Sequence, residues 1–276
     1  MPRRHNRVRE HALAMMRCTH CGGGPLTHAS GAPALTCTQC RTLFPILDGI
    51  PDMTPPSGAH PHDDYRTEAM LNLIAPVYDP FFPVVSTLVW RCSPLRFIDH
   101  ANLAIGRANR GVLLAAPVDT GALLSRLLTD YHDVHVFAVD RSWRMLRTAQ
   151  RQLANSPVDI TFLRVDFGHL PIADGVVDCV QSTNGLHTFP DRARALAEFR
   201  RTLAPSATLS GSALIRGAEP VADAFIEWFE RQGFFPLLRT AEFLHLDLRE
   251  VFPEIRFETH GAVMFYTSEL SGDALS

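Results

Sequence analysis

The chain has 276 residues, of which 46% are hydrophobic and 20% are charged. This length and composition are typical of one large folded domain with a small additional module. The formal net charge of -3 argues against bulk electrostatic attraction to nucleic acid or to an anionic membrane. The N-terminal stretch lacks the apolar core of a secretory signal, and no later run is long and apolar enough to span a bilayer. We therefore expect a cytoplasmic protein with no membrane partner.

Local charge differs from this average in the first 14 residues. The stretch "MPRRHNRVREH" holds arginine at positions 3, 4, 7 and 9 against a single acidic side chain at Glu10. We treat residues 1–14 as a basic arm, which leaves open a contact with RNA.

Four of the six cysteines follow this arm as two CxxC pairs separated by fifteen residues. The four are Cys18, Cys21, Cys37 and Cys40. Two CxxC turns joined by a hairpin can direct four thiolates at one tetrahedral ion. This spacing predicts a structural zinc site, because four thiolates leave the ion no open position for substrate or water. A redox CxxC is the weaker alternative, since no strand and helix follow either pair.

Residues 15–53, which end in "FPILDGIPDM", resemble the small zinc ribbons that act as activators of tRNA methyltransferases or are fused ahead of methyltransferase domains. Proline, glycine and polar residues then mark residues 54–64 as a linker.

The remaining residues, 65–276, alternate between strand and helix patterns after an apolar start. Residues 65–90 have apolar side chains at helical spacing, and Pro76, Pro80 and Pro83 predict that this helical lid is broken into short pieces. Strands are predicted at residues 111–116, 134–140, 160–166, 176–183, 207–215, 255–260 and 263–268. Helices are predicted at residues 121–131, 142–155, 191–204, 221–232 and 237–251. The alternation predicts an α/β fold with a mostly parallel sheet, helices on both faces, and ligands at the carboxyl ends of the strands.

Asp140 ends the second of these strands, nineteen residues beyond Gly121. A carboxylate there is placed to accept hydrogen bonds from both hydroxyls of an adenosine ribose. This position fits a nicotinamide cofactor and S-adenosylmethionine equally.

Four motifs in order separate these two cofactors. They are "VDRSWRML", "LPIADGVVDCV", "GLHTFPD" and "ALAEFRRTLAP". With these motifs the chain resembles the class I S-adenosylmethionine-dependent methyltransferases, in particular the branch with the ubiquinone and menaquinone methyltransferases. The resemblance implies a Rossmann-like, seven-stranded sheet and covers residues 65–276.

The resemblance also implies which residues hold the cofactor. Asp140 would bind the ribose, Asp166 and Phe167 the adenine, and Met145 one face of the adenine, although Met145 fits an ordinary core role equally well. Tyr78 is the first choice for an aromatic residue that covers the cofactor from the lid, and Tyr65 is the second. The complete candidate set is Tyr78, Ala115, Ala116, Pro117, Asp119, Gly121, Asp140, Arg141, Met145, Asp166, Phe167 and Ser182. His187 in "GLHTFPD" is the candidate general base, with a role in the turn alone as the alternative.

The turn at the methionine end of the cofactor departs from the family pattern D/E-x-G-x-G-x-G. Ala115 replaces the acidic residue, Pro117 has no N–H to donate, and Asp119 replaces a glycine. Aspartate tolerates a positive φ better than most residues, so the turn can survive. The Asp119 carboxylate either repels the carboxylate of the cofactor, or it caps the following helix or faces the ammonium or sulfonium, and we favour the second arrangement.

Three functions remain open. The first is methyl transfer from S-adenosylmethionine to a small apolar or aromatic molecule, such as an intermediate of secondary metabolism. The second is methylation of a ribosomal RNA guanine, which the ribbon and the basic arm favour and the negative net charge disfavours. The third is a methyltransferase fold that no longer methylates and serves as a cyclase, an isomerase or a binding partner.

Overall fold

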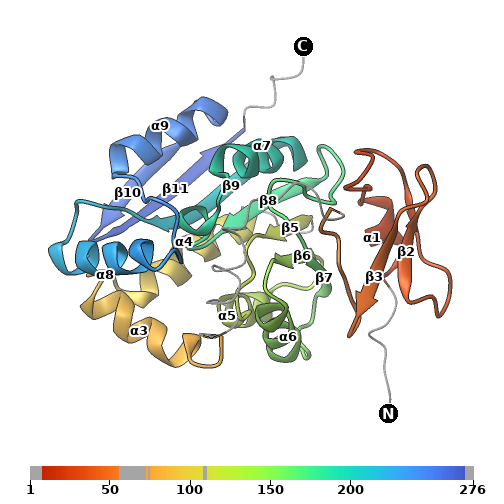
Figure 1. Ribbon diagram of the computed structural model, residues 1–276, viewed down its shortest axis with the longest axis horizontal. Coiled ribbons are helices and arrows are strands. Elements are labelled where there is room, and N and C mark those ends of the chain that lie inside the picture. The colour runs from red at the N-terminus through yellow and green to blue at the C-terminus, as the bar shows by residue number, and fades with distance from the viewer. Residues whose placement is uncertain (1–7, 56–72, 74, 108–110, 271–276) are drawn as a thin grey trace.

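The computed structural model describes residues 8–55, 73, 75–107 and 111–270 (Figure 1). The linker from residue 56 onward and Tyr65 lie outside the described residues. The described residues form a small N-terminal sheet and a large α/β unit, and one hydrophobic core continues from the first into the second.

The small unit is a helix followed by four short antiparallel strands. Its elements are α1 (Glu10–Ala14), β1 (Leu26–Thr27), β2 (Ala34–Cys37), β3 (Leu43–Leu47) and β4 (Ile50–Pro51), with the strands in that spatial order. Each CxxC pair lies beside a strand, so the hairpins bring the two pairs together. The sequence gives no cap signal for α1, which forms part of the arm and is held to the core by fully buried Ala12.

The large unit contains a seven-stranded sheet in the order β10-β11-β9-β8-β5-β6-β7. The strands are β5 (Val112–Ala115), β6 (His135–Asp140), β7 (Asp159–Arg164), β8 (Val177–Ser182), β9 (Leu203–Leu214), β10 (Arg256–His260) and β11 (Val263–Glu269). All of them run parallel except β11, which pairs antiparallel with β9 and β10. The predicted fold class is confirmed: the sheet is mostly parallel and has helices on both faces.

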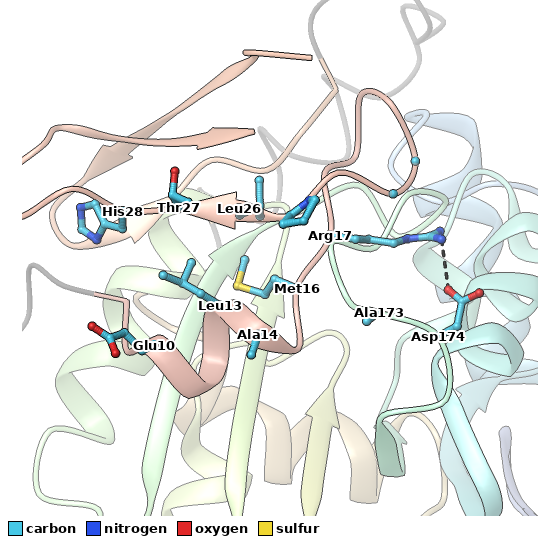
Figure 2. Close-up of a pocket in the computed structure, with 13 residues that line it drawn as sticks. Glu10, Leu13, Ala14, Met16, Arg17, Leu26, Thr27, His28, Ala173 and Asp174 are labelled. Atoms are coloured by element: carbon cyan, nitrogen blue, oxygen red, sulfur yellow. Dashed lines mark hydrogen bonds and ion pairs between the residues drawn. The ribbon is translucent and has the colours of Figure 1, made fainter. Parts of the chain in front are cut away.

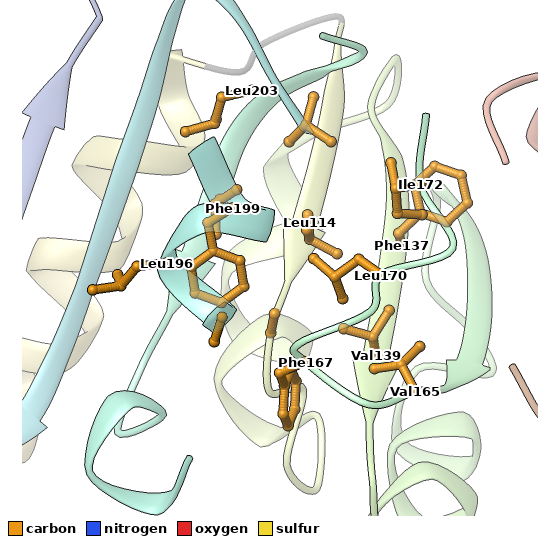
Figure 3. Packing of buried hydrophobic residues seen from close by; sticks show 14 of the residues in the cluster. Leu114, Phe137, Val139, Val165, Phe167, Leu170, Ile172, Leu196, Phe199 and Leu203 are labelled. Atoms are coloured by element: carbon orange, nitrogen blue, oxygen red, sulfur yellow. The ribbon is translucent and has the colours of Figure 1, made fainter. Parts of the chain in front are cut away.

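Helices cover the two faces of this sheet unequally (Figure 1). They are α3 (Tyr78–Leu88), α4 (Pro94–Arg107), α5 (Ala122–Leu127), α6 (Trp143–Gln152), α7 (Arg192–Thr202), α8 (Pro220–Arg231) and α9 (Ala241–Val251). Alternate residues of each strand point to opposite faces, so Leu114 and Phe137 pack with Phe199 of α7, whereas Leu113 lies in a second core with α4, α5 and α6. Figure 3 shows the first of these cores, with Val139 among its labelled side chains.

The lid differs from the prediction in one respect. The prolines at 80 and 83 do not break α3, which continues from Tyr78 to Leu88. Pro80 lies in the first turn, where a backbone N–H has no intrahelical acceptor, so it costs no hydrogen bond. No helix was predicted over α4, which buries Phe97 and Ala101 on one side. Within the described residues, none of the helices has both the length and the apolar character needed to cross a bilayer.

The small unit docks along the free edge of β7. The backbone N–H of Met53 donates to the carbonyl of Arg164 at 2.8 Å, and the Arg164 side chain pairs with Asp52 at 2.9 Å. A second contact joins the N–H of Arg17 to the carbonyl of Pro171 at 2.9 Å. The ribbon therefore covers an edge strand that would otherwise expose unpaired backbone groups.

Candidate functional site

The chain changes direction across the sheet at β5, which has β6 on one side and β8 on the other. Such a switch point places a ligand crevice beyond the carboxyl ends of the strands. A cavity of about 140 Å³ lies there, between the ends of β5 and β8 and the lid helix α3. Four of the predicted cofactor residues line it: Tyr78, Ala115, Pro117 and Asp119.

A larger hollow of about 670 Å³ lies elsewhere, where α1 and β1 meet the loop at Ala173 and Asp174 (Figure 2). Figure 2 shows Leu13 and Met16 on its floor, and Arg17 reaching Asp174 at 3.1 Å. It is open, and it lies away from the carboxyl ends of the strands. We therefore place the cofactor site at the smaller cavity.

Asp119 keeps the turn after β5 in the shape that glycine would give it. Its φ is +51°, and its backbone N–H donates to Oδ2 of Asp140 at 3.1 Å. Of the two favourable placements expected for Asp119, the helix cap is not formed: Gly121 is the N-cap residue of α5, with φ of +79° and no side-chain cap. Position 121 favours glycine for two reasons. Its backbone is left-handed, and a Cβ there would lie 3.0 Å from the backbone of Ala149. The Asp119 side chain instead borders the cavity.

Three carboxylates crowd this end of the cavity. Burial, together with the charges of Asp140 and Asp79, raises the pKa of Asp119 well above its usual value. Burial also raises the pKa of Asp140 to about 7, although the N–H groups of Ser142 and Asp119 oppose the shift. Negative charge on this cluster is therefore unfavourable, and a cationic group in the cavity would stabilise it.

Asp79 is a site residue that the sequence analysis missed. It is the second residue of α3, and its carboxylate accepts hydrogen bonds from the Thr120 hydroxyl and, at 2.6 Å, from Nε2 of Gln152. One side chain thus connects the lid helix to the cofactor turn and to the last residue of α6. The motif patterns carry no signal for it, because Asp79 lies in a proline-rich segment outside all four motifs.

The ribose and adenine candidates lie behind the cavity wall. Asp140 is 2% exposed, and its Oδ1 accepts a hydrogen bond from the N–H of Ser142 at 2.9 Å. Asp166 accepts from His169 at 2.7 Å, and Phe167 stacks on Phe189 with centroids 4.3 Å apart. The predicted residues that do not border the cavity are Ala116, Gly121, Asp140, Arg141, Met145, Asp166, Phe167 and Ser182.

His187 has the wrong environment for a general base. It is 6% exposed, and its Nδ1 accepts a hydrogen bond from the N–H of Leu214 at 3.2 Å. Burial lowers its pKa to about 3, so the ring is neutral and its proton is on Nε2. A ring whose one lone pair is already bonded has none left to accept a proton from a substrate. We do not carry this role forward.

The four predicted cysteines converge in the ribbon. Their sulfur atoms all lie within 4.8 Å of one another, with Cys18 and Cys40 at 3.7 Å and Cys21 and Cys37 at 3.7 Å. Sulfurs at about 2.3 Å from one tetrahedral zinc ion would be about 3.8 Å apart. Gly24 leaves the space this requires, because a Cβ there would lie 2.4 Å from Sγ of Cys37. The residues present therefore fit a four-cysteine zinc ion.

Comparisons with known proteins agree with this geometry. Residues 117–206 match the model of a family described as a methyltransferase domain. The large unit is therefore similar to the methyltransferase domains of this family. The demethylmenaquinone methyltransferase of Thermus thermophilus is 33% identical over 143 residues, which are 51% of this chain and 62% of that protein. The malonyl-[acyl-carrier protein] O-methyltransferase of Geobacter sulfurreducens is 36% identical over 127 residues, which are 46% of this chain and 45% of that protein. The chain thus spans less than two thirds of either relative.

A solved structure shows the same fold. It is the phosphoethanolamine N-methyltransferase 2 of Haemonchus contortus in complex with S-adenosyl-L-methionine, with a TM-score of 0.63 and 13% identity. The alignment covers 80% of this chain and 62% of that one.

The cavity of the large unit has groups that suit the methionine end of S-adenosylmethionine. Oε1 of Gln181 and Nδ2 of Asn184 are buried at the cavity without a hydrogen-bond partner in the part of the chain that the structure describes. Such orphan polar atoms are costly unless a ligand or water reaches them. Beside them, the carboxylates of Asp119 and Asp79 favour a cation, and the sulfonium and ammonium are cationic. The residues present therefore fit this cofactor.

The crowded carboxylates predict a particular pH dependence. The folded-state pKa values of Asp119 and Asp140 exceed the unfolded values, so the folded state binds more protons than the unfolded state between about pH 4 and pH 7. The free energy of unfolding therefore falls as pH rises through this window. Thermal unfolding of the cofactor-free protein should show Asp119→Asn losing fewer degrees than the wild type over this range. Asp130→Asn, which changes an exposed carboxylate, serves as the control. If the melting temperatures of all three proteins change with pH in parallel, the pKa of Asp119 is not raised in the folded state.

Proposed function

We propose that the chain is an S-adenosylmethionine-dependent methyltransferase that acts on a small apolar or aromatic acceptor. The observation that carries this proposal is the cavity at the switch point, whose lining combines acidic and polar side chains with apolar ones. Asp119, Thr120 and Asn184 are among the polar residues, and Phe82 and Phe97, whose rings pack against each other, are among the apolar ones. An acceptor against the apolar side chains would lie beside the cationic end of the cofactor.

Three polar residues of the site have a defined task in this proposal. S-adenosylmethionine, when bound, supplies a methyl carbon on a sulfonium, which the acceptor attacks in line. Asp140, at the end of β6, accepts hydrogen bonds from the ribose hydroxyls, and Asp119 faces the cationic end. Tyr78 keeps its proton, because burial and then the charge of Asp119 raise its pKa well above its usual value. It can therefore donate a hydrogen bond at the acceptor side.

The cavity requires the lid to move before the cofactor enters. Its volume of about 140 Å³ is below the 300 Å³ or more typical of small-molecule sites. Asp79 holds α3 against Thr120 and Gln152, so the cofactor enters when these contacts open. Closure afterwards would exclude water from the acceptor.

The names of the curated relatives guide the choice of acceptors for the test. We expect the full chain to transfer a radiolabelled methyl group from S-adenosylmethionine to an aromatic acceptor such as a naphthoquinol or a phenol, rather than to a thioester-bound acid or to RNA. Product is measured by extraction into organic solvent for small acceptors and by precipitation for RNA. Asp140→Ala is the matched inactive variant.

The outcomes separate the three functions. Label in the extracted product supports the proposal. Label in RNA, with a steep loss at higher salt, would instead establish the ribosomal RNA alternative. Tight cofactor binding with no transfer to any acceptor class would favour a fold that binds the cofactor without methylating, such as a cyclase or an isomerase.

The ribbon is proposed to bind one structural zinc ion through Cys18, Cys21, Cys37 and Cys40. Its contacts to β7 place it more than one strand away from the cavity, so its task is to stabilise the sheet edge rather than to touch substrate. We propose domain limits of residues 15–53 for the ribbon, 54–64 for the linker and 65–276 for the methyltransferase domain.

A further inference from the structure

Two histidines and one aspartate meet where the N-terminal arm contacts the sheet. His11 lies in α1, whereas His135 and Asp159 are the first residues of β6 and β7 and are paired with each other in the strand register. This cluster is at the amino ends of the strands. The proposed cofactor site is at their carboxyl ends, where β6 finishes at Asp140. The cluster therefore has no part in methyl transfer as proposed above.

One atom from each side chain points into the same small space. Nε2 of His11 lies 2.8 Å from Oδ2 of Asp159 and 3.2 Å from Nδ1 of His135. Nδ1 of His135 lies 3.3 Å from the same Oδ2. Imidazole nitrogens and carboxylate oxygens bind zinc at about 2.0–2.2 Å, which places neighbouring ligands about 2.8–3.6 Å apart in octahedral or tetrahedral geometry. The triangle of contacts has the size of one face of a metal coordination shell.

Protons alone cannot satisfy all three contacts. Each ring nitrogen either carries a proton or offers a lone pair. If both His11 and His135 donate to Asp159, their two N–H groups face each other across 3.2 Å. If one of these two nitrogens carries no proton, its lone pair faces the carboxylate oxygen of Asp159, and two hydrogen-bond acceptors are brought together. A cation at the centre accepts all three lone pairs at once.

Neighbouring side chains support this arrangement of the ligand atoms. Nε of Arg9 pairs with Oδ1 of Asp159 at 3.2 Å and leaves Oδ2 for the ion. The Thr161 hydroxyl lies 3.4 Å from Nε2 of His135, on the opposite side of the ring from Nδ1. Partners of this kind fix the orientation of metal ligands in known sites. A surface cavity of about 260 Å³, bordered by Arg9, Asp159 and Thr161, gives access to water.

We propose that His11, His135 and Asp159 form a second metal site, which binds a divalent transition-metal ion of the zinc type. Two imidazoles and one carboxylate are a donor set that suits zinc, and water would complete the shell. Because the ligands come from α1 and from two adjacent strands, the ion clamps the arm to the sheet. This is a structural task, and it is separate from the thiolate site in the ribbon.

The test is a cobalt(II) titration of the full chain after its metals have been removed by a chelator. Cobalt bound by thiolates gives an intense sulfur-to-metal charge-transfer band, whereas cobalt bound by nitrogen and oxygen gives only weak d–d bands. We expect one equivalent of cobalt to bind at His11, His135 and Asp159 without a charge-transfer band. This result does not depend on whether a second cobalt ion binds to the cysteines of the ribbon. His11→Ala should lose this equivalent and leave the thiolate band unchanged.

Two controls keep the result interpretable. His132→Ala changes an exposed histidine of the same region and should keep the equivalent. Arg9→Ala removes an ion pair that docks the arm but no ligand, so it should keep the ion and separate ligation from docking. The proposal is overturned if the wild type shows only thiolate-bound cobalt or none, or if His11→Ala retains the nitrogen and oxygen equivalent.

Discussion

Asp140→Ala is expected to weaken the binding of S-adenosylmethionine by about a hundredfold or more. Two hydrogen bonds from ribose hydroxyls to a carboxylate contribute about 1.5–3 kcal/mol each, and every 1.4 kcal/mol changes the dissociation constant tenfold. The substitution also removes the acceptor for the N–H groups of Asp119 and Ser142, so the turn after β5 loses an anchor. Isothermal titration calorimetry with the wild type and the variant measures the change.

Two further variants isolate the role of the Asp140 carboxylate. Asp140→Asn keeps one acceptor oxygen and should fall between the wild type and Asp140→Ala. Asp130→Ala removes an exposed carboxylate and should leave the dissociation constant unchanged. Thermal unfolding of each variant shows whether the domain remains folded. A folded Asp140→Ala protein with wild-type affinity would refute the assignment of Asp140 to the ribose.

Removal of zinc from the ribbon is expected to unfold residues 18–53. The four strands are only two to five residues long, and the metal links the two CxxC turns, so the core contacts of the ribbon are not expected to keep it folded alone. Binding of a structural zinc ion contributes about 10–16 kcal/mol in small zinc modules. Cys37→Ala should therefore bind one zinc fewer than the wild type, and the amide hydrogens of these residues should exchange faster.

A second cysteine tests whether this effect is specific. Cys92 is buried outside the cluster, and Cys92→Ala should keep the zinc content and the slow exchange of the ribbon. The β4 contacts to β7 are lost with the ribbon, so exchange should also rise at Arg164 on the sheet edge. A ribbon that stays protected without zinc would contradict the assignment.

Much of the fold follows from local patterns in the sequence. Buried parallel strands are continuous apolar runs, and helices between them have an apolar stripe, so both were predicted close to their observed bounds. Ser142 is the first residue of a predicted helix and caps α6, because its hydroxyl accepts the N–H of Met145 at 3.1 Å. Asp178, in the motif "LPIADGVVDCV", joins β8 to β5, because its carboxylate accepts the N–H of Val112 at 2.7 Å.

The parts that the sequence analysis missed depend on tertiary contacts. Asp79 reaches Thr120 and Gln152 only after the lid folds over the turn, and no local period marks it. His187 was given a chemical role from its motif, but burial and a backbone hydrogen bond decide its protonation. His11 lies more than one hundred residues before His135, and no metal spacing in the sequence connects them. Long-range proximity of this kind is established only by the packed structure.

The measurement that tests the central claim most directly is a calorimetric titration of the full, metal-replete protein with S-adenosylmethionine. The acidic cavity lined by Asp79 and Asp119, with Asp140 behind its wall, predicts binding of one cofactor per chain. It also predicts that the neutral demethylated product, S-adenosylhomocysteine, binds more weakly, because it lacks the positive sulfonium that these carboxylates favour. Absence of binding at millimolar cofactor would contradict the account, because it would mean that the altered turn from Ala115 to Gly121 no longer binds the cofactor.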